Sequence, residues 1–296
     1  MKSRLYLPKV DPVPQSILDY LTMRFPHIPA STWRERIARG QVAADDGTVI
    51  TPDSSYRHGI TILYSKEVLR EPLPDMQETV LYRDSKILVA DKPHGMVVTP
   101  SGSHVERALL SRLRQSTGLA ALTPIHRLDR ETAGLVLFTI LSESRDSYHR
   151  LFSERLIERE YLAVATIGKS TQQKEWHVET RMEAGEPWFR RRIADDSSDE
   201  PNAVTHIECL ESQHDLGLFR LRPETGKKHQ LRVHMAALGF PILGDTLYPE
   251  IRESQQGAPP LQLLARSLSF KDPLSGEPRR FTSTQKLLWP AEFQFR

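Results

Sequence analysis

The spacing of hydrophobic residues changes twice along the chain. The first 65 or so residues begin with helical spacing and continue with alternating apolar and polar positions, as on strands. Between residues 67 and 77, prolines and acidic residues interrupt the pattern and leave little periodicity. Further on, short apolar runs alternate with amphipathic helices. The pattern predicts a small module at 1–70, a linker at 71–78 and a larger domain at 79–296.

Two helices are expected to precede three strands in the small module. Ser16 can cap the first helix, and Thr32 with Glu35 forms a capping-box pair for a second helix that ends at Gly40. A hairpin turn is expected at 45–47. The strands are predicted at residues 41–44, 48–50 and 59–64. The expected order is therefore ααβββ.

The larger domain is expected to be α+β. Its apolar runs predict buried strands at residues 87–90, 135–138, 161–164 and 218–221. Amphipathic helices are expected near 105–114 and 144–155. Since strands and helices do not alternate regularly, a repeated βαβ array is not expected.

The overall charge says little about a partner. The 296 residues include 40 Lys plus Arg and 38 Asp plus Glu, a net charge of +2, so nucleic-acid binding has to be argued from local clusters. One cluster is Arg34, Arg36 and Arg39 beside Trp33 in the second predicted helix. Such arginines suit a solvated helix face or phosphate contacts, and the sequence leaves both open.

A single cysteine, Cys209, excludes an internal disulfide framework and suits a reducing compartment. The chain starts without the apolar core of a secretory signal, so a cytoplasmic protein is expected. His229 and His234 are five residues apart, with no carboxylate or cysteine partner in their segment, which argues against a metal pair. Neither a metal nor a cofactor is expected.

The first candidate for chemistry is Asp129, which stands between Arg127 and Arg130 just ahead of an apolar strand. Nearby positive charge favours the ionised carboxylate, which would then act as an acceptor or nucleophile rather than as an acid. A structural salt bridge explains the same residues. From local sequence alone, the salt bridge is the favoured interpretation.

The second candidate is the turn around Gly226, where Lys227, Lys228 and Arg232 would suit a phosphate-rich ligand. A Walker A loop is excluded, because Leu221 stands five residues before Gly226 where that loop requires glycine, and no Ser or Thr follows Lys227. A nucleoside triphosphatase is therefore not expected.

Three ordered motifs, at residues 89–98, 126–134 and 225–248, together closely resemble the RluA-type pseudouridine synthases of ribosomal and transfer RNA. The resemblance implies the pseudouridine synthase fold: a mixed, mostly antiparallel sheet with flanking helices and a central RNA cleft. Members often carry an S4-like RNA-binding module in front, and the pattern of residues 1–70 is similar to one.

The resemblance also implies roles for individual residues. Asp129 matches the catalytic aspartate, Tyr161 the ring that stacks on the target base, Arg232 the ion-pair partner of Asp129, and Arg127 the arginine that fills the space of the flipped-out nucleotide. Arg34, Arg36 and Arg39 would contact phosphates. Further residues expected to line the RNA groove are Lys92, His126, Thr132, Lys227, Lys228, His229 and Gln230.

The implied activity is isomerisation of uridine to pseudouridine in a structured RNA, ribosomal or transfer, by a monomer that needs no cofactor. Asp129 would act first either as a nucleophile or as a base, and the sequence leaves that choice open. The main alternative is a catalytically silent RNA-binding or ribosome-assembly protein of the same fold. A third possibility is a hydrolase that releases free uracil.

Overall fold

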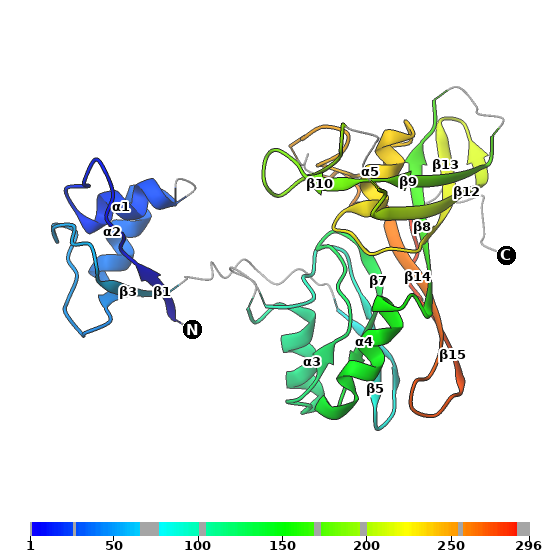
Figure 1. Ribbon diagram of the computed structural model, residues 1–296, viewed down its shortest axis with the longest axis horizontal. Coiled ribbons are helices and arrows are strands. Elements are labelled where there is room, and N and C mark those ends of the chain that lie inside the picture. The colour runs from blue at the N-terminus through cyan, green and yellow to red at the C-terminus, as the bar shows by residue number, and fades with distance from the viewer. Residues whose placement is uncertain are drawn as a thin grey trace. The chain divides into compact units, whose positions relative to one another are not determined.

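The chain folds into two compact units, residues 1–71 and 72–296, in the computed structural model (Figure 1). The structure describes residues 2–25, 28–65, 77–100, 105–168, 173–195, 200–253 and 257–288. Most of the predicted linker at 71–78 lies outside these ranges, because its first six residues are not among them.

The first unit is a three-stranded antiparallel sheet with two helices. Its elements are β1 (Lys2–Tyr6), α1 (Ile17–Arg24), α2 (Ala30–Ala38), β2 (Val42–Ala44) and β3 (Thr61–Ser65). The strand order is β1-β3-β2, so the strand nearest the chain start pairs with the last strand of the unit. Trp33 of α2 is fully buried in a core that includes Leu7 and Ile62.

Several details of this unit differ from the sequence prediction. The order ααβββ is wrong, because β1 precedes the helices and residues 48–50 contribute only a single bridge, between Ala43 and Val49. Ser16 does cap α1, with Asp19 closing a capping box. The Thr32 box is wrong, since α2 already begins after Pro29 and its cap makes no side-chain hydrogen bond.

The second unit is built around one large sheet. Its strands are β4 (Thr79–Arg83), β5 (Ile87–Lys92), β6 (Thr123–Pro124), β7 (Ala133–Thr139), β8 (Ile157–Thr166), β9 (Glu175–Thr180), β12 (Ala203–Gln213), β13 (Leu216–Pro223), β14 (Leu263–Lys271) and β15 (Pro278–Thr282). The main strand order is β4-β5-β7-β14-β8-β13-β12-β9, with β6 on β7 and β15 on β14. A separate two-stranded hairpin is formed by β10 (Met182–Ala184) and β11 (Arg191–Ile193).

Among the strand pairs that the structure describes, β7 and β14 alone run parallel, so the expectation of a mostly antiparallel mixed sheet is confirmed. At this junction Gly134 has φ +110, and a Cβ there would collide with the backbone of Ala265. Glycine therefore permits the close contact between β7 and β14. The contact fixes the start of β7, and with it the loop at 126–132.

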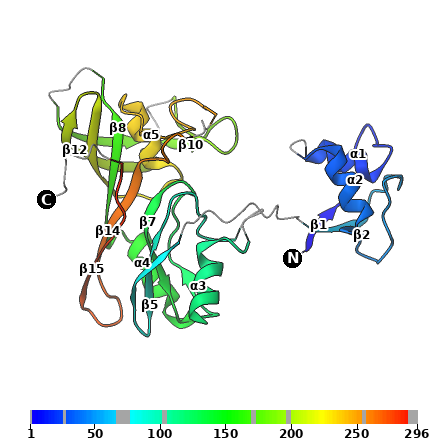
Figure 2. The ribbon, with the colours of Figure 1, turned by 180° about the vertical axis from the view of Figure 1, so that it is seen from behind.

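Three helices cover the sheet (Figures 1 and 2). They are α3 (Leu109–Thr117), α4 (Arg145–Ser153), preceded by a 3₁₀ turn at Ser142–Ser144, and α5 (Gln230–Ala237). α3 and α4 pack on opposite faces of β5 and β7, which explains why these strands are buried along their whole length. α5 packs on β8, β13 and β14.

None of the helices in the described part of the chain is long and apolar enough to cross a membrane.

Candidate active site

A cavity of about 900 Å³ lies between the loop before β7, the start of β8 and the turn that leads into α5. Sequence segments more than 90 residues apart thus form one site. Most of the residues that the sequence singled out line it: His126, Arg127, Asp129, Thr132, Tyr161, Lys227, Lys228, His229, Gln230 and Arg232.

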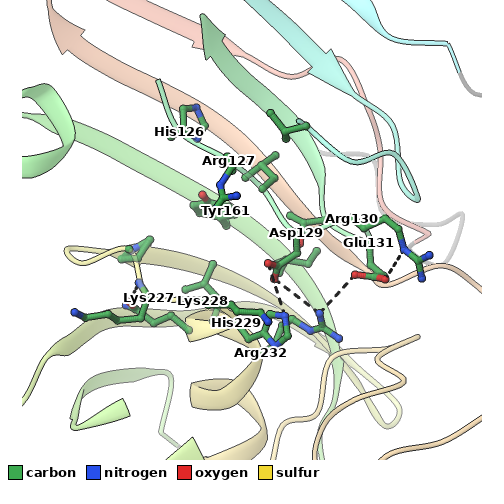
Figure 3. A pocket seen from close by; sticks show the side chains of 18 of the residues that line it. His126, Arg127, Asp129, Arg130, Glu131, Tyr161, Lys227, Lys228, His229 and Arg232 are labelled. Atoms are coloured by element: carbon green, nitrogen blue, oxygen red, sulfur yellow. Dashed lines mark hydrogen bonds and ion pairs between the residues drawn. The ribbon is translucent and has the colours of Figure 1, made fainter. Parts of the chain in front are cut away.

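Asp129 stands in the loop at 126–132, which leads directly into β7. Before the loop the Ile125 N–H donates to Leu137 O of β7 at 2.9 Å, and within the loop the Thr132 N–H donates to Asp129 O at 3.2 Å, which closes a turn. The side chain of Asp129 is 27% exposed and points toward Arg232 and His229 (Figure 3). The loop therefore presents the carboxylate to the cavity from a rigid base.

Arg232 is the cation that faces Asp129, and it is held from behind by Asp245. Its Nε and Nη2 donate to the two Asp245 oxygens at 2.8 and 2.7 Å, and the side chain is 1% exposed. Its Nη1 makes no hydrogen bond and lies 3.8 Å from Asp129 Oδ2 and 3.8 Å from Glu131 Oε2. Burial works to lower the pKa of Arg232, but Asp245, Asp129 and Glu131 outweigh it and raise the pKa.

The two arginines that flank Asp129 in the sequence do not form the salt bridge that the local pattern suggested. Arg130 pairs with Glu131 at 2.9 Å instead, and Arg127 is exposed on the opposite wall from Lys227 and Lys228 (Figure 3). The positive charge at the carboxylate comes from Arg232, about a hundred positions away in the chain. The local explanation of a salt bridge to flanking arginines is therefore wrong.

His229 is the second nitrogen group beside Asp129. Its Nε2 lies 3.8 Å from Asp129 Oδ1, and its Nδ1 is 2.9 Å from the hydroxyl of Tyr248. Burial lowers the pKa of His229, and this effect exceeds the opposing pull of Asp129. His229 is thus a neutral hydrogen-bonding group at pH 7, while Arg232 carries the fixed charge.

Tyr161 forms part of the cavity wall from strand β8, where it pairs with Leu221 and Ala265. The residue is 9% exposed. Burial raises the pKa of its hydroxyl, which stays protonated at neutral pH, and the charge of Asp129 acts in the same direction. The site can therefore offer an aromatic surface beside an ionisable carboxylate.

His126 lines the cavity but is already engaged by the scaffold. Its Nε2 accepts the Leu137 N–H at 3.1 Å, and its ring stacks on Phe152 with centroids 4.7 Å apart. Burial lowers the pKa of His126 to about 3, with Arg159 adding to the effect. The ring is neutral, and one of its two nitrogens holds the loop against β7.

Lys92 does not line an RNA groove, contrary to the sequence prediction. Its side chain is fully buried, and Nζ donates to the carbonyls of Pro93, Met96 and Arg130 at 3.0, 2.8 and 3.1 Å. Burial lowers its pKa to about 7. The residue ties the end of β5 to the loop that carries Asp129, so its role is to position that loop.

Gln230 is also a scaffold residue rather than a free RNA contact. Its Oε1 accepts from Thr225 Oγ1 and the Lys227 N–H, and its Nε2 donates to Val204 O and Thr205 Oγ1, all at 2.8 to 3.0 Å. The four bonds fix the turn before α5.

The turn that Gln230 fixes presents Lys227 and Lys228 to solvent at the cavity. Both side chains are exposed, and their contact with RNA phosphates stays a prediction. Thr132, in contrast, is 3% exposed, so little of it can reach a ligand.

The arginine cluster of the first unit does not form one exposed face. Arg34 is exposed, but Arg36 is buried with its guanidinium 5.0 Å from the Trp33 ring centroid. Arg39 pairs with Glu35 at 2.6 Å on the surface. The expectation that all three contact phosphates is wrong for Arg36, whose side chain packs against the core.

Asp245, Tyr248 and Glu131 complete the site but had received no role from the sequence. Asp245 and Tyr248 lie in the third motif, and their spacing from Arg232 was the available signal. The pairing itself depends on how the segment after α5 folds back. Within the described residues, no group of three or more His, Cys, Asp or Glu side chains is arranged to hold a metal ion.

The comparison with known families matches residues 86–237 to the model described as RNA pseudouridylate synthase. The matched segment contains Asp129, Tyr161 and Arg232. A relative named ribosomal large subunit pseudouridine synthase D, from Xanthomonas campestris pv. campestris, is 32% identical, and the match covers 86% of this chain and 81% of that protein. An RNA pseudouridine synthase of Synechocystis sp. is 31% identical, with 78% and 79% covered.

Among solved structures, human RNA Pseudouridylate Synthase Domain Containing 1 superposes with a TM-score of 0.60 at 22% identity, covering 75% of this chain and 94% of that one. The human Domain Containing 4 protein gives a TM-score of 0.55 at 24% identity, with 72% and 89% covered. At these identities the likeness concerns the fold.

Proposed function

The chain belongs to the RNA pseudouridylate synthase family, of the RluA type, and isomerises uridine to pseudouridine in RNA; we propose that Asp129 is the carboxylate that performs this reaction. The observation that carries the proposal is the unbonded Nη1 of Arg232, which is buried and lies 3.8 Å from Asp129 Oδ2. A fixed cation with one unused donor is suited to orient a reacting carboxylate.

The reaction breaks the bond between N1 of uracil and the ribose C1′ and forms a bond from C5 to C1′. N1 gains a proton and C5 loses one, so atoms and charge balance without a redox or hydrolytic step. A base stacked in a folded RNA must first be extruded to reach a side chain. The cavity of about 900 Å³ is large enough to receive a nucleotide.

Four residues would divide the work within the cavity. Asp129 would attack the nucleotide or remove a ribose proton, and Arg232, held by Asp245, would fix the direction of the carboxylate. Tyr161 would stack on the uracil and keep it in place while it rotates. Arg127, exposed at the cavity, would occupy the space that the extruded nucleotide leaves in the RNA.

For the substrate, we propose ribosomal RNA. The match to the Xanthomonas campestris relative covers 86% of this chain, and that relative is named for the large ribosomal subunit. Lys227 and Lys228 provide exposed positive charge at the cavity for the backbone of such an RNA.

The experiment is chemical mapping of pseudouridine over all stable RNAs from cells with and without the gene. We expect one or a few ribosomal positions to lose pseudouridine and to regain it when the gene is restored. Loss at transfer RNA positions instead would overturn the proposed substrate but keep the activity. Release of free uracil from RNA by the purified enzyme would overturn the isomerase assignment.

A further inference from the structure

The tip of the β10–β11 hairpin carries an exposed tryptophan beside the cavity. Trp188 is 83% exposed, the highest value among the large hydrophobic side chains that the structure describes. Its neighbour Phe189 is half-buried and lines the cavity. The two rings meet edge to face, with centroids 5.8 Å apart and planes at 82°. Phe189 thus connects the exposed ring to the wall of the active site.

The hairpin tip is held firmly, so the exposure of Trp188 does not reflect a loosely packed turn. The Arg190 N–H donates to Pro187 O at 2.8 Å, which closes the turn. The Arg190 side chain donates to Pro249 O at 2.6 Å and covers the Tyr248 ring at 5.0 Å. The Arg191 N–H donates to the hydroxyl of Tyr248 at 2.7 Å.

This anchoring reaches the active site through shared side chains. The Tyr248 hydroxyl that accepts from the hairpin is also 2.9 Å from His229 Nδ1, and His229 Nε2 lies 3.8 Å from Asp129. The hairpin is therefore linked through Tyr248 to His229, the histidine that borders the reacting carboxylate. A ring placed at the tip keeps a fixed place relative to Asp129.

A cation accompanies the exposed ring. Lys228 Nζ lies 6.0 Å from the Trp188 ring centroid, and Lys228 itself is an exposed residue of the cavity. A largely exposed ring with a lysine over it matches what a nucleotide offers: a base that stacks on the ring and a phosphate that pairs with the ammonium group. A protein partner would more often require a wider apolar patch with little charge at its centre.

We propose that Trp188 is a stacking platform for an unpaired base that flanks the target uridine in the RNA, with Lys228 contacting the phosphate between them. The inference rests on the proposed function, because the target uridine has to enter the cavity at Asp129. It adds a second nucleotide site to the enzyme: one base enters the cavity, and a neighbour is held outside it. Substrates with an unpaired nucleotide beside the target are therefore preferred.

The test compares three variants at one exposed position: Trp188→Ala, Trp188→Phe and Trp188→Leu. The probe is the ribosomal and transfer RNA extracted from cells that lack the gene, incubated with excess full-length enzyme. Pseudouridine formation is followed against enzyme concentration, which gives the half-saturating concentration and the maximal rate. Stacking on a base contributes about 1 to 3 kcal/mol, or roughly 5- to 150-fold in affinity.

We expect Trp188→Ala and Trp188→Leu to raise the half-saturating concentration at least about fivefold with the maximal rate nearly unchanged, and Trp188→Phe to stay within about threefold of the wild type. Leucine keeps an apolar surface but has no ring, so wild-type behaviour of Trp188→Leu would overturn stacking. Wild-type behaviour of all three variants would overturn any RNA contact at this position.

A double-mutant cycle then identifies the base. In short RNAs built around the mapped uridine, each flanking nucleotide is replaced in turn by an abasic one. At one flanking position the abasic RNA and Trp188→Ala should weaken binding by the same factor, singly or together. Additive losses at every position would contradict the proposal.

Lys228→Ala should weaken binding and reduce the salt dependence by about one counterion, with exposed Lys86→Ala as the control. Unchanged binding by Lys228→Ala would remove the phosphate contact from the proposal. The activity of Asp129→Asn distinguishes failure of the stacking proposal from failure of the proposed function. If Asp129→Asn is inactive while Trp188→Ala binds RNA normally, the stacking proposal alone fails. If Asp129→Asn is active, the proposed function of Asp129 fails.

Discussion

Asp245 holds Arg232 through two hydrogen bonds of 2.7 and 2.8 Å and so points the remaining guanidinium nitrogen at Asp129. Both side chains of the Arg232 and Asp245 pair are 1% exposed. The pair lies behind the proposed reacting carboxylate, and it sets the direction of the cation without consuming the donor that faces the cavity.

Removal of this support should cost both stability and rate. Asp245→Ala leaves a buried guanidinium without its carboxylate, and we expect the free energy of unfolding to fall by about 3 to 5 kcal/mol. Asp245→Asn, which retains one acceptor, should lose less stability but lower the rate of pseudouridine formation, because Arg232 is no longer held in one direction.

Denaturant unfolding and single-turnover assays measure these two effects. The control is Glu250→Gln, which removes the exposed pair with Arg252 and should change stability by less than about 0.5 kcal/mol. Equal effects of Asp245→Asn and Glu250→Gln on the rate would contradict the role assigned to Asp245.

Burial of the His126 ring should make the enzyme less stable in mild acid than at neutral pH. Burial lowers its pKa to about 3, below the ordinary value of 6.5, so the unfolded chain binds this proton more readily than the folded one. The contribution of the neutral His126 ring to the free energy of unfolding is therefore complete above pH 6.5, and it is lost as the pH falls toward 3. Between pH 7.5 and pH 5 the loss amounts to as much as about 2 kcal/mol.

Unfolding titrations of the wild type and His126→Gln at pH 7.5 and pH 5 provide the measurement. We expect the difference in stability between the two pH values to shrink in His126→Gln and to remain in His149→Gln, which alters an exposed histidine on α4. The prediction is wrong if all three proteins show the same pH dependence.

Two arginines on the same helix of the N-terminal unit should respond in opposite ways. Arg34 is exposed, so Arg34→Ala should weaken RNA binding, reduce the salt slope by about one and leave stability within about 0.5 kcal/mol. Arg36 is buried against Trp33, so Arg36→Ala should destabilise the unit by about 1 to 2 kcal/mol. Filter binding at several salt concentrations and thermal unfolding separate the two outcomes. An unchanged salt slope in Arg34→Ala would argue against RNA binding by this unit.

The elements that sequence analysis predicted best are those whose pattern depends on burial alone. The runs that became β5, β7 and β8 are continuous and apolar, because helices or neighbouring segments cover both faces, and in β13 Arg220 alone interrupts the apolar run at 218–221. β1 was missed because its five residues are mostly polar or charged and have no turn signal before them. Its strand conformation comes from pairing with β3, some sixty residues later.

The residues of the candidate site could likewise be predicted only in part from the sequence. The resemblance to the RluA-type synthases predicted a shared site for Asp129, Tyr161 and Arg232, and all three line one cavity. It could not show that Lys92 is buried on three carbonyls, since residue type alone suggests an exposed cation. Nor could it show that Asp245 is the main partner of Arg232, because that contact depends on how the chain turns after α5.

The most direct test of the account is the rate of pseudouridine formation by Asp129→Asn on RNA from cells that lack the gene. Asparagine keeps the size of the side chain and removes its charge, so RNA affinity should stay within a few fold. The account predicts that the rate falls at least about a thousandfold, as expected when the reacting group is lost. A rate within about threefold of the wild type would contradict it.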